Sequence, residues 1–210
     1  MSRVAIKICG LSTPETLHAA IKGGAAHVGF VLFAKSPRNV SIDRLAQLSA
    51  LVPDHVGKIG VMVDPDDMLV ERTMPFLDTL QLHGTESPER LSALRARSGK
   101  KLWKAIPVKN RNDLKMGRTF AGAADLLLFD AKTPAGTLPG GMGLRFDWAL
   151  LAGFDPPLPW GLSGGLDPDN VSQAIRVTGT PMVDVSSGVE SAPGVKQVDK
   201  IIAFCKAVGP

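Results

Sequence analysis

The chain has 210 residues, of which 44% are hydrophobic and 21% charged, and this composition is typical of a globular protein with a substantial core. Its net charge of +4 comes from scattered lysines and arginines without a basic block, which argues against a nucleic-acid partner and suits a small anionic substrate. No apolar run approaches the ~20 residues of a membrane helix, and two distant cysteines without a CxxC pair argue against a disulfide scaffold or a zinc site, so we expect a cytoplasmic protein with no metal and no membrane partner.

Eight short apolar runs along the chain are typical of β-strands. They cover residues 4–8, 27–33, 57–63, 78–82, 101–106, 125–129, 158–163 and 181–186. Most of these runs are continuously apolar rather than alternating, which is the pattern of strands that are buried on both faces.

Stretches with helical spacing separate these runs. They include residues 13–24, 41–52, 87–97, 167–179 and 194–208. Thr13, Ser41 and Ser87 open the first three as N-caps, and the last places Val195, Val198 and Cys205 on one apolar stripe. The alternation of strand and helix predicts a parallel sheet, either open and doubly wound or closed into a (β/α)8 barrel. Eight units favour the α/β TIM barrel, as a single domain over residues 1–210.

In such a barrel, function lies at the carboxyl ends of the strands. Cys9 ends the first strand, and it is either a small packing residue or a thiol placed for chemistry. Lys7 lies two residues earlier on the same side of the strand, where its charge would favour the Cys9 thiolate. Cys205, on the apolar helix stripe, is interpreted as a packing residue.

Further titratable residues follow other strands. Asp130 ends the apolar run DLLLFD and is either an acid–base residue or a structural cap. Arg38 is either a surface residue or a clamp for a carboxylate, and His83 is either a substrate contact or a loop histidine. Asp184 shares strand parity with Ser186, so the two side chains are expected on the same side.

Two glycine loops follow the last two strands. The segments LSGGL and VSSGVES contain Ser163, Gly164, Gly165, Ser186, Ser187 and Gly188. Glycine loops ahead of a helix let backbone N–H groups approach an oxyanion, and the loops after strands seven and eight are the common phosphate site of barrel enzymes. The alternative is a pair of tight turns in which glycine is ordinary.

One connection is unusually long. Residues 131–143, AKTPAGTLPGGMG, directly follow Asp130 and exceed the usual connection of ~2–6 residues between strand and helix. A long glycine-rich loop beside an acid predicts a lid that closes over the substrate. The alternative is an inert surface insertion.

The ordered motifs resemble a known family. KICGL, GFVLFAKSPRNV, GVMVD, LQLHGTES, LLLFDAKTP, FDW, LSGGLDPDNV and VDVSSGVES together resemble the phosphoribosylanthranilate isomerases of tryptophan biosynthesis, from residue 4 to about residue 204. The resemblance implies a compact (β/α)8 barrel without a cofactor. It also implies an Amadori rearrangement that converts phosphoribosylanthranilate to carboxyphenylamino-deoxyribulose phosphate, in a monomer or homodimer.

The resemblance also implies roles for single residues. Cys9 becomes the general base, Asp130 the general acid, and Arg38 the partner of the anthranilate carboxylate. The phosphate falls on the loops 163–165 and 186–188, and His83 and Asp184 become substrate contacts. The sequence departs from the family at Ser163, where Ala is frequent, and at GMG (141–143), where Gly-Thr-Gly is usual.

Three other functions remain open at this point. The first is another phosphosugar barrel. An epimerase of this kind requires paired carboxylates and often a metal, and an indole-forming synthase requires a second well-placed lysine. A Schiff-base aldolase would depend on Lys7 alone. A barrel that binds a phosphosugar without turnover would have no need of both Cys9 and Asp130.

Overall fold

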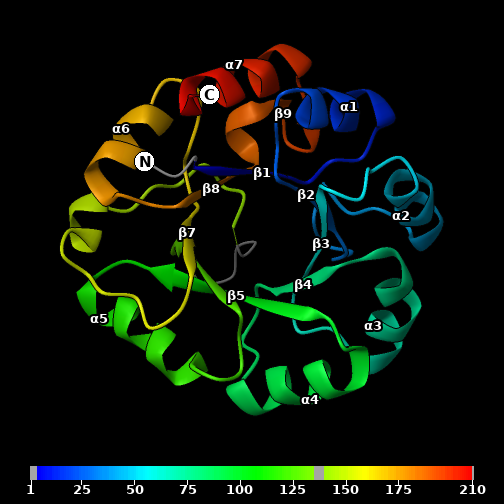
Figure 1. Cartoon of the computed structure of the whole chain (residues 1–210), viewed down its shortest axis with the longest axis horizontal. Helices are drawn as coiled ribbons and strands as arrows, with labels where there is room; N and C mark the ends of the chain where they lie inside the picture. Colours follow the sequence, from blue (N-terminus) through cyan, green and yellow to red (C-terminus); the bar gives the residue numbers. More distant parts are fainter. Residues whose placement is uncertain (1–3, 135–139, 210) are drawn as a thin grey trace.

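The computed structural model describes residues 4–134 and 140–209. Eight parallel strands close into a barrel in which each strand neighbours the next and β1 neighbours β8 (Figure 1). The strands are β1 (Ala5–Cys9), β2 (His27–Val31), β3 (Gly57–Met62), β4 (Thr79–Leu82), β5 (Lys101–Val108), β6 (Leu126–Ala131), β7 (Trp160–Leu162) and β8 (Met182–Val185). The closed barrel is thus confirmed, and the open doubly wound sheet is wrong.

Helices form a ring outside the strands (Figure 1). They are α1 (Pro14–Lys22), α2 (Ile42–Ser49), α3 (Asp67–Thr73), α4 (Pro88–Ser98), α5 (Arg111–Lys115), α6 (Val171–Thr178) and α7 (Val198–Val208), with 3-10 turns η1 (Met74–Phe76), η2 (Met116–Phe120), η3 (Trp148–Leu151) and η4 (Ser187–Val189). The side chains of Thr13, Ser41 and Ser87 each accept a hydrogen bond from a backbone N–H in the first turn, so the three predicted caps are confirmed.

A small hairpin replaces the start of the last predicted helix. Two short antiparallel strands, β9 (Glu190–Ala192) and β10 (Val195–Lys196), lie between β8 and α7. Gly194 turns the chain between them with a φ of +82°, and its N–H donates to a Glu190 carboxylate oxygen at 3.3 Å. The prediction that Val195 lies on an apolar helix stripe is therefore wrong, and Val195 is 54% exposed.

Apolar side chains form two separate clusters. The larger one joins alternate strand residues, such as Ile6 and Ile8, to residues of the helices, and it fills the layer between barrel and ring. Cys205 is buried there, as predicted. The smaller cluster consists of strand residues, including Val61, Trp103 and Leu128, and fills the barrel interior. Cys9 belongs to this inner cluster.

A buried ion pair ties the first strand to the last. Lys7 and Asp184 are register partners across β1 and β8, and the Lys7 ammonium donates to both Asp184 carboxylate oxygens at 2.9 and 2.8 Å. Lys7 is fully buried. Two facing charges inside a barrel must be paired to be tolerated, so this contact fixes both side chains below the mouth.

Within the described residues, no helix is both long and apolar enough to cross a membrane.

Candidate active site

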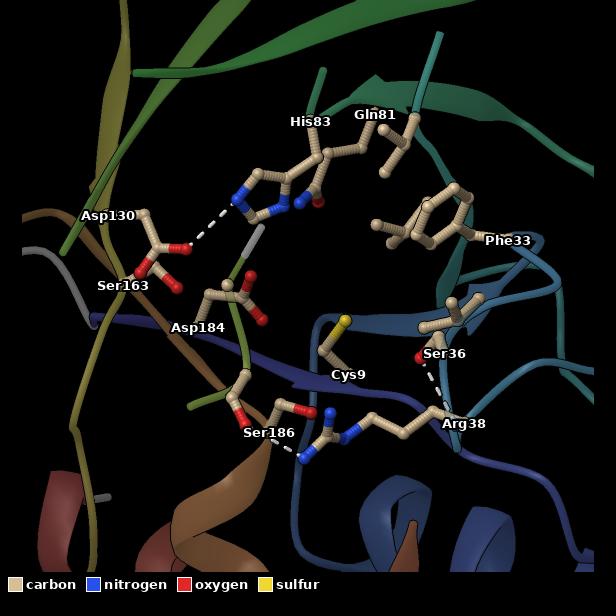
Figure 2. Close-up of a pocket in the computed structure, with 15 residues that line it drawn as sticks. Cys9, Phe33, Ser36, Arg38, Gln81, His83, Asp130, Ser163, Asp184 and Ser186 are labelled. Carbon is tan, nitrogen blue, oxygen red and sulfur yellow. Dashed lines mark hydrogen bonds and ion pairs between the residues drawn. The ribbon is translucent and has the colours of Figure 1, made fainter. Parts of the chain in front are cut away.

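A pocket opens at the carboxyl end of the barrel. Figure 2 shows Cys9 and Arg38 on one side of it and His83 and Asp130 on the other. These four side chains come from β1, the segment after β2, the residue that follows β4, and β6. The remaining polar lining residues are Ser36, Gln81, Ser163, Asp184 and Ser186. The structure therefore brings together the candidate residues that the sequence placed after separate strands.

Cys9 lies at the base of the pocket with little exposure to solvent. Burial raises the pKa of its thiol, while the nearby charges of Lys7 and Lys196 lower it without offsetting the burial. The Lys7 charge therefore does favour the Cys9 thiolate, as expected, but burial outweighs it and the pKa of the thiol is raised overall. Burial alone would lower the pKa of Lys7, but the Asp184 carboxylate and the Cys9 sulfur raise it, so Lys7 is charged yet already paired.

Asp130 and His83 form a contact pair across the pocket from Cys9. The His83 Nε2 atom lies 3.0 Å from the Asp130 Oδ2 atom, and the other carboxylate oxygen accepts from the N–H of Ala131 at 2.8 Å. Asp130 is buried at the mouth of the barrel. Its Oδ2 atom therefore faces a ring that can carry a proton, which is an arrangement suited to acid–base work.

The described end of the long loop lies against this pair. A Cβ added at Gly140 would lie 2.6 Å from His83 Cε1 and 2.9 Å from Asp130 Oδ2, and Gly140 has a φ of +73°. Gly140 thus covers the acid side of the pocket, whereas Gly141 lies against Arg38. The other part of the predicted lid, residues 135–139, lies outside the described residues, so the lid remains a prediction.

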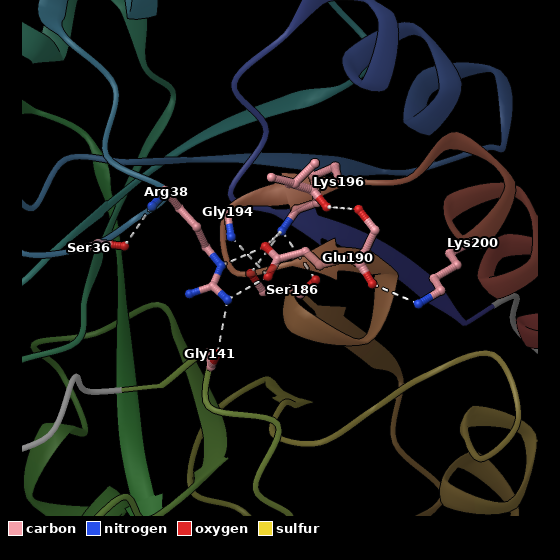
Figure 3. A network of polar contacts seen from close by, with 10 residues as sticks. Ser36, Arg38, Gly141, Ser186, Glu190, Gly194, Lys196 and Lys200 are labelled. Carbon is pink, nitrogen blue, oxygen red and sulfur yellow. Dashed lines mark hydrogen bonds and ion pairs between the residues drawn. The ribbon is translucent and has the colours of Figure 1, made fainter.

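Arg38 belongs to a buried network of charges (Figure 3). Its Nε and Nη2 atoms donate to the two carboxylate oxygens of Glu190 at 2.8 Å each, and Nη2 also donates to the carbonyl of Gly141 at 3.0 Å. Lys196 donates to the same Glu190 carboxylate and to Ser186. The interpretation of Arg38 as a surface residue is wrong, since it is 6% exposed. No acceptor among the described residues bonds its Nη1 atom, which leaves a donor for an anion.

Sequence reasoning missed Glu190 and Lys196. Burial alone would raise the pKa of Glu190, but the hydrogen bonds and charges of Arg38 and Lys196 lower it, so the carboxylate is ionised. Burial lowers the pKa of Lys196 although Glu190 opposes that effect. A Cβ at Gly10 would lie 2.8 Å from Arg38 Cδ and 3.2 Å from Lys196 Nζ. The glycine after Cys9 was thus the available sequence signal, because it marks a close approach by other side chains.

The two glycine loops line a second cavity beside the pocket. It is bounded by Ser163, Gly164, Gly165, Ser186 and Ser187, with Asp130 and residues 140–144 on its other side. Gly164 and Gly165 have φ values of +88° and +64°, and their N–H groups bond to none of the described residues. Such free donors suit an oxyanion.

Gly188 has a packing reason to be glycine. A Cβ there would lie 1.9 Å from the carbonyl oxygen of Leu166, so the loops after β7 and β8 touch.

Among the described residues, no group of three or more His, Cys, Asp or Glu side chains could hold a metal ion.

Comparison with known proteins identifies the family. The family model for N-(5'phosphoribosyl)anthranilate (PRA) isomerase matches residues 6–207. A relative from Zymomonas mobilis subsp. pomaceae, named N-(5'-phosphoribosyl)anthranilate isomerase, is 54% identical over 98% of both chains. The chain belongs to the phosphoribosylanthranilate isomerase family. The predicted enzyme of tryptophan biosynthesis is thereby confirmed, and the epimerase, synthase, aldolase and non-catalytic alternatives are wrong.

Solved members of this isomerase family share the barrel. The structure of the Thermotoga maritima enzyme superimposes with a TM-score of 0.88 at 34% identity, over 98% of both chains. A second structure of a phosphoribosylanthranilate isomerase, at 32% identity and a TM-score of 0.85, covers 98% of both chains. That protein is in complex with reduced 1-(o-carboxyphenylamino)-1-deoxyribulose 5-phosphate.

Proposed function

We propose that Cys9 is the general base and Asp130 the general acid of this isomerisation, in which N-(5-phosphoribosyl)anthranilate becomes 1-(2-carboxyphenylamino)-1-deoxyribulose 5-phosphate. One observation carries the proposal: a single pocket holds a thiol from β1 and a carboxyl from β6 on opposite sides. An isomerisation that opens a sugar ring and then moves a proton between neighbouring carbons needs one acid and one base, placed apart.

Asp130 acts first. It donates a proton to the ring oxygen of the aminofuranoside while the bond between that oxygen and C1′ breaks, and the nitrogen lone pair forms the iminium. His83, at 3.0 Å from Asp130, lies where it can return a proton to the carboxylate.

Cys9 acts second. As thiolate it removes the proton from C2′, and the electrons of that C–H bond neutralise the iminium to give an enolamine. The enolamine then gains a proton at C1′ and loses the proton of its C2′ hydroxyl, which produces the ketose without net proton change. Burial raises the pKa of the Cys9 thiol, so the thiol first loses its proton to solvent water, and the cationic iminium beside it then favours the thiolate.

The two ends of the pocket suit the two anionic ends of the substrate. Glu190 holds the Arg38 guanidinium in place, and the Nη1 atom of that group binds the anthranilate carboxylate. Such a charge-assisted pair is strong and directional. The loops at Ser163–Gly165 and Ser186–Gly188 bind the phosphate. His83 and Asp184, which both line the pocket, contact the sugar between these ends.

The proposal is tested with Cys9→Ser and Asp130→Asn. Turnover is followed by the loss of anthranilate fluorescence with freshly made substrate, and binding is followed with the reduced product analogue. Each variant is expected to lose ~10²–10⁴-fold in kcat and to retain analogue binding. Near-normal turnover in either variant would remove that residue from the mechanism.

Location and oligomeric state complete the proposal. The enzyme acts in the cytoplasm on its small anionic substrate without a nucleic-acid partner, and it is a monomer or a homodimer. A solved structure from Thermotoga maritima contains monomers generated from a dimeric phosphoribosylanthranilate isomerase, so both forms occur for that relative. Light scattering of the purified protein at micromolar concentration distinguishes the two forms.

A further inference from the structure

The amide oxygen of Gln81 is a buried acceptor without a partner among the residues that the structure describes. Gln81 lies on β4, is 2% exposed, and lines the same pocket as Cys9 and Asp130. Its Oε1 atom bonds to none of the described residues. An unmade hydrogen bond at a buried amide is costly, so such a group needs a reason to be there.

Gln81 differs from the other residues with unbonded buried polar atoms because it lines the pocket. Four buried side-chain atoms lack a partner among the described residues, and the other three belong to His27, Arg95 and Trp148. None of those three residues lines the pocket, whereas Gln81 does. Figure 2 shows the Gln81 side chain reaching from its strand to a position beside the His83 ring, above Cys9 and Asp184.

The backbone fixes where this amide can go. Gln81 sits inside β4 with Val61 and Trp103 as register partners on the two neighbouring strands. Both neighbours are buried in the cluster that fills the barrel interior, so they confine the Gln81 side chain from either side. A polar group held by packed neighbours is preorganised for a ligand rather than free to rotate away.

The chemistry of an amide selects the substrate group. An amide is neutral and offers an acceptor and a donor side by side, which matches a hydroxyl group. It does not match the two anionic ends, for which Arg38 and the glycine loops are the candidates. We propose that Gln81 is a substrate-binding residue whose amide bonds to a hydroxyl of the sugar, beside the carbon atoms that react. This inference rests on the proposed function for where the sugar lies.

The proposal makes Gln81 a specificity residue. A site with a buried polar group rejects a ligand that lacks the matching hydroxyl, because the group is then left unbonded in the complex. The enzyme should therefore discriminate against sugars without that hydroxyl. If Gln81 were only a packing residue, it would give no such discrimination.

The first test is Gln81→Met, which keeps the length of the side chain and removes the amide. We expect kcat/KM to fall about 5–150-fold, the range for one hydrogen bond to a buried group. The melting temperature should stay equal or rise, because a buried group without a partner is removed. Gln173→Met, exposed on α6, is the matched control and should change neither value. An unchanged kcat/KM in Gln81→Met overturns the proposal.

The second test separates binding from a structural effect. The probes are the reduced product analogue and its derivatives that each lack one hydroxyl of the sugar chain, and calorimetry gives their affinities. For one derivative, wild type should lose about 5–150-fold in affinity while Gln81→Met loses none. Equal losses in both proteins for every derivative overturn the proposal. Since binding needs no proton transfer, repeating the cycle in Cys9→Ala keeps this result independent of the roles of Cys9 and Asp130.

Discussion

Cys9 combines deep burial with two lysines in its vicinity. Burial raises the pKa of the thiol, and the charges of Lys7 and Lys196 oppose that change from two sides. Lys7 is shared with Asp184, whereas Lys196 is shared with Glu190. The reactivity of this sulfur is therefore set by a balance of charges and not by one neighbour.

This balance predicts how the thiol titrates. In a Cys205→Ala background, the rate of alkylation of Cys9 by iodoacetamide should still be rising above the ordinary thiol pKa of ~8.5. Lys196→Met should move the curve to higher pH, because a charge that favours the thiolate is lost. Lys115→Met, a substitution at an exposed site, should leave the curve in place. A Lys196→Met curve identical to that of the parent would show that Lys196 does not act on Cys9.

Arg38 gives the second prediction at this scale. Arg38→Ala should raise KM about 10–150-fold, because a charge-assisted pair with the substrate carboxylate is lost. Glu190→Gln keeps one acceptor for the guanidinium and should raise KM by less, with kcat changed only a few-fold. Arg118→Ala removes an exposed arginine and serves as the control in steady-state kinetics. If KM in Arg38→Ala equals that of wild type, the carboxylate binds elsewhere.

At the scale of elements, two glycines with similar backbones allow a matched test of the segment 140–143. Gly140 and Gly153 have φ values of +73° and +65°, so a Cβ strains both backbones alike. Only at Gly140 would that Cβ meet the His83 ring and Asp130, while nothing lies within 4 Å at Gly153. Gly140→Ala should therefore lower kcat about tenfold or more through the acid, and Gly153→Ala should lower only the melting temperature.

Equal kinetic effects in the two glycine variants would count against a role of this segment at the acid. A supporting measurement is proteolytic nicking of the loop 131–143, which the product analogue should suppress if the loop closes over the ligand. Nicking at the same rate with and without the analogue would mean that the loop is only long.

The elements also show what a sequence pattern can and cannot predict. The eight apolar runs predicted the eight strands because burial on both faces leaves a local signature. The second strand of the hairpin, β10, was predicted as the start of the last helix because Val195 shares a spacing with the apolar residues of α7. The ion pair between Arg38 and Glu190 spans 152 positions, and no local pattern reports a contact made by closure of a barrel. Cys9, Asp130 and the glycine loops were predicted as site residues because the ends of strands can be located in the sequence. Glu190, Lys196 and the unbonded amide oxygen of Gln81 were not predicted, because no local pattern marks them.

At the scale of the whole molecule, His27 links stability to pH. Its ring packs edge-on against Trp103 with a centroid distance of 5.0 Å, and its Nδ1 atom is buried. Burial, with the charges of Lys7 and Lys101, lowers the pKa of His27 to about 4. The native state thus keeps this ring neutral at pH values where the unfolded chain, with a pKa of ~6.5, already binds a proton.

The sign of this linkage predicts acid destabilisation. The contribution of His27 to stability is complete above pH ~6.5 and is lost as the pH falls toward about 4. Melting temperatures across this window should fall less steeply in His27→Gln than in wild type. His55→Gln, at an exposed position, controls for the loss of an imidazole. Parallel slopes for wild type and His27→Gln would contradict the assignment.

The ion pair between Lys7 and Asp184 has a consequence for how the chain reaches its native state. The two residues are 177 positions apart, yet they face each other across the seam that closes the barrel. Until β8 docks on β1, the Lys7 ammonium has water as its partner, and it can be dehydrated only when the carboxylate arrives. Seam formation and drying of the interior are then one event, and contacts of such long range are slow to form. During refolding, circular dichroism should recover early with the local helices, and turnover should return only when the seam has formed.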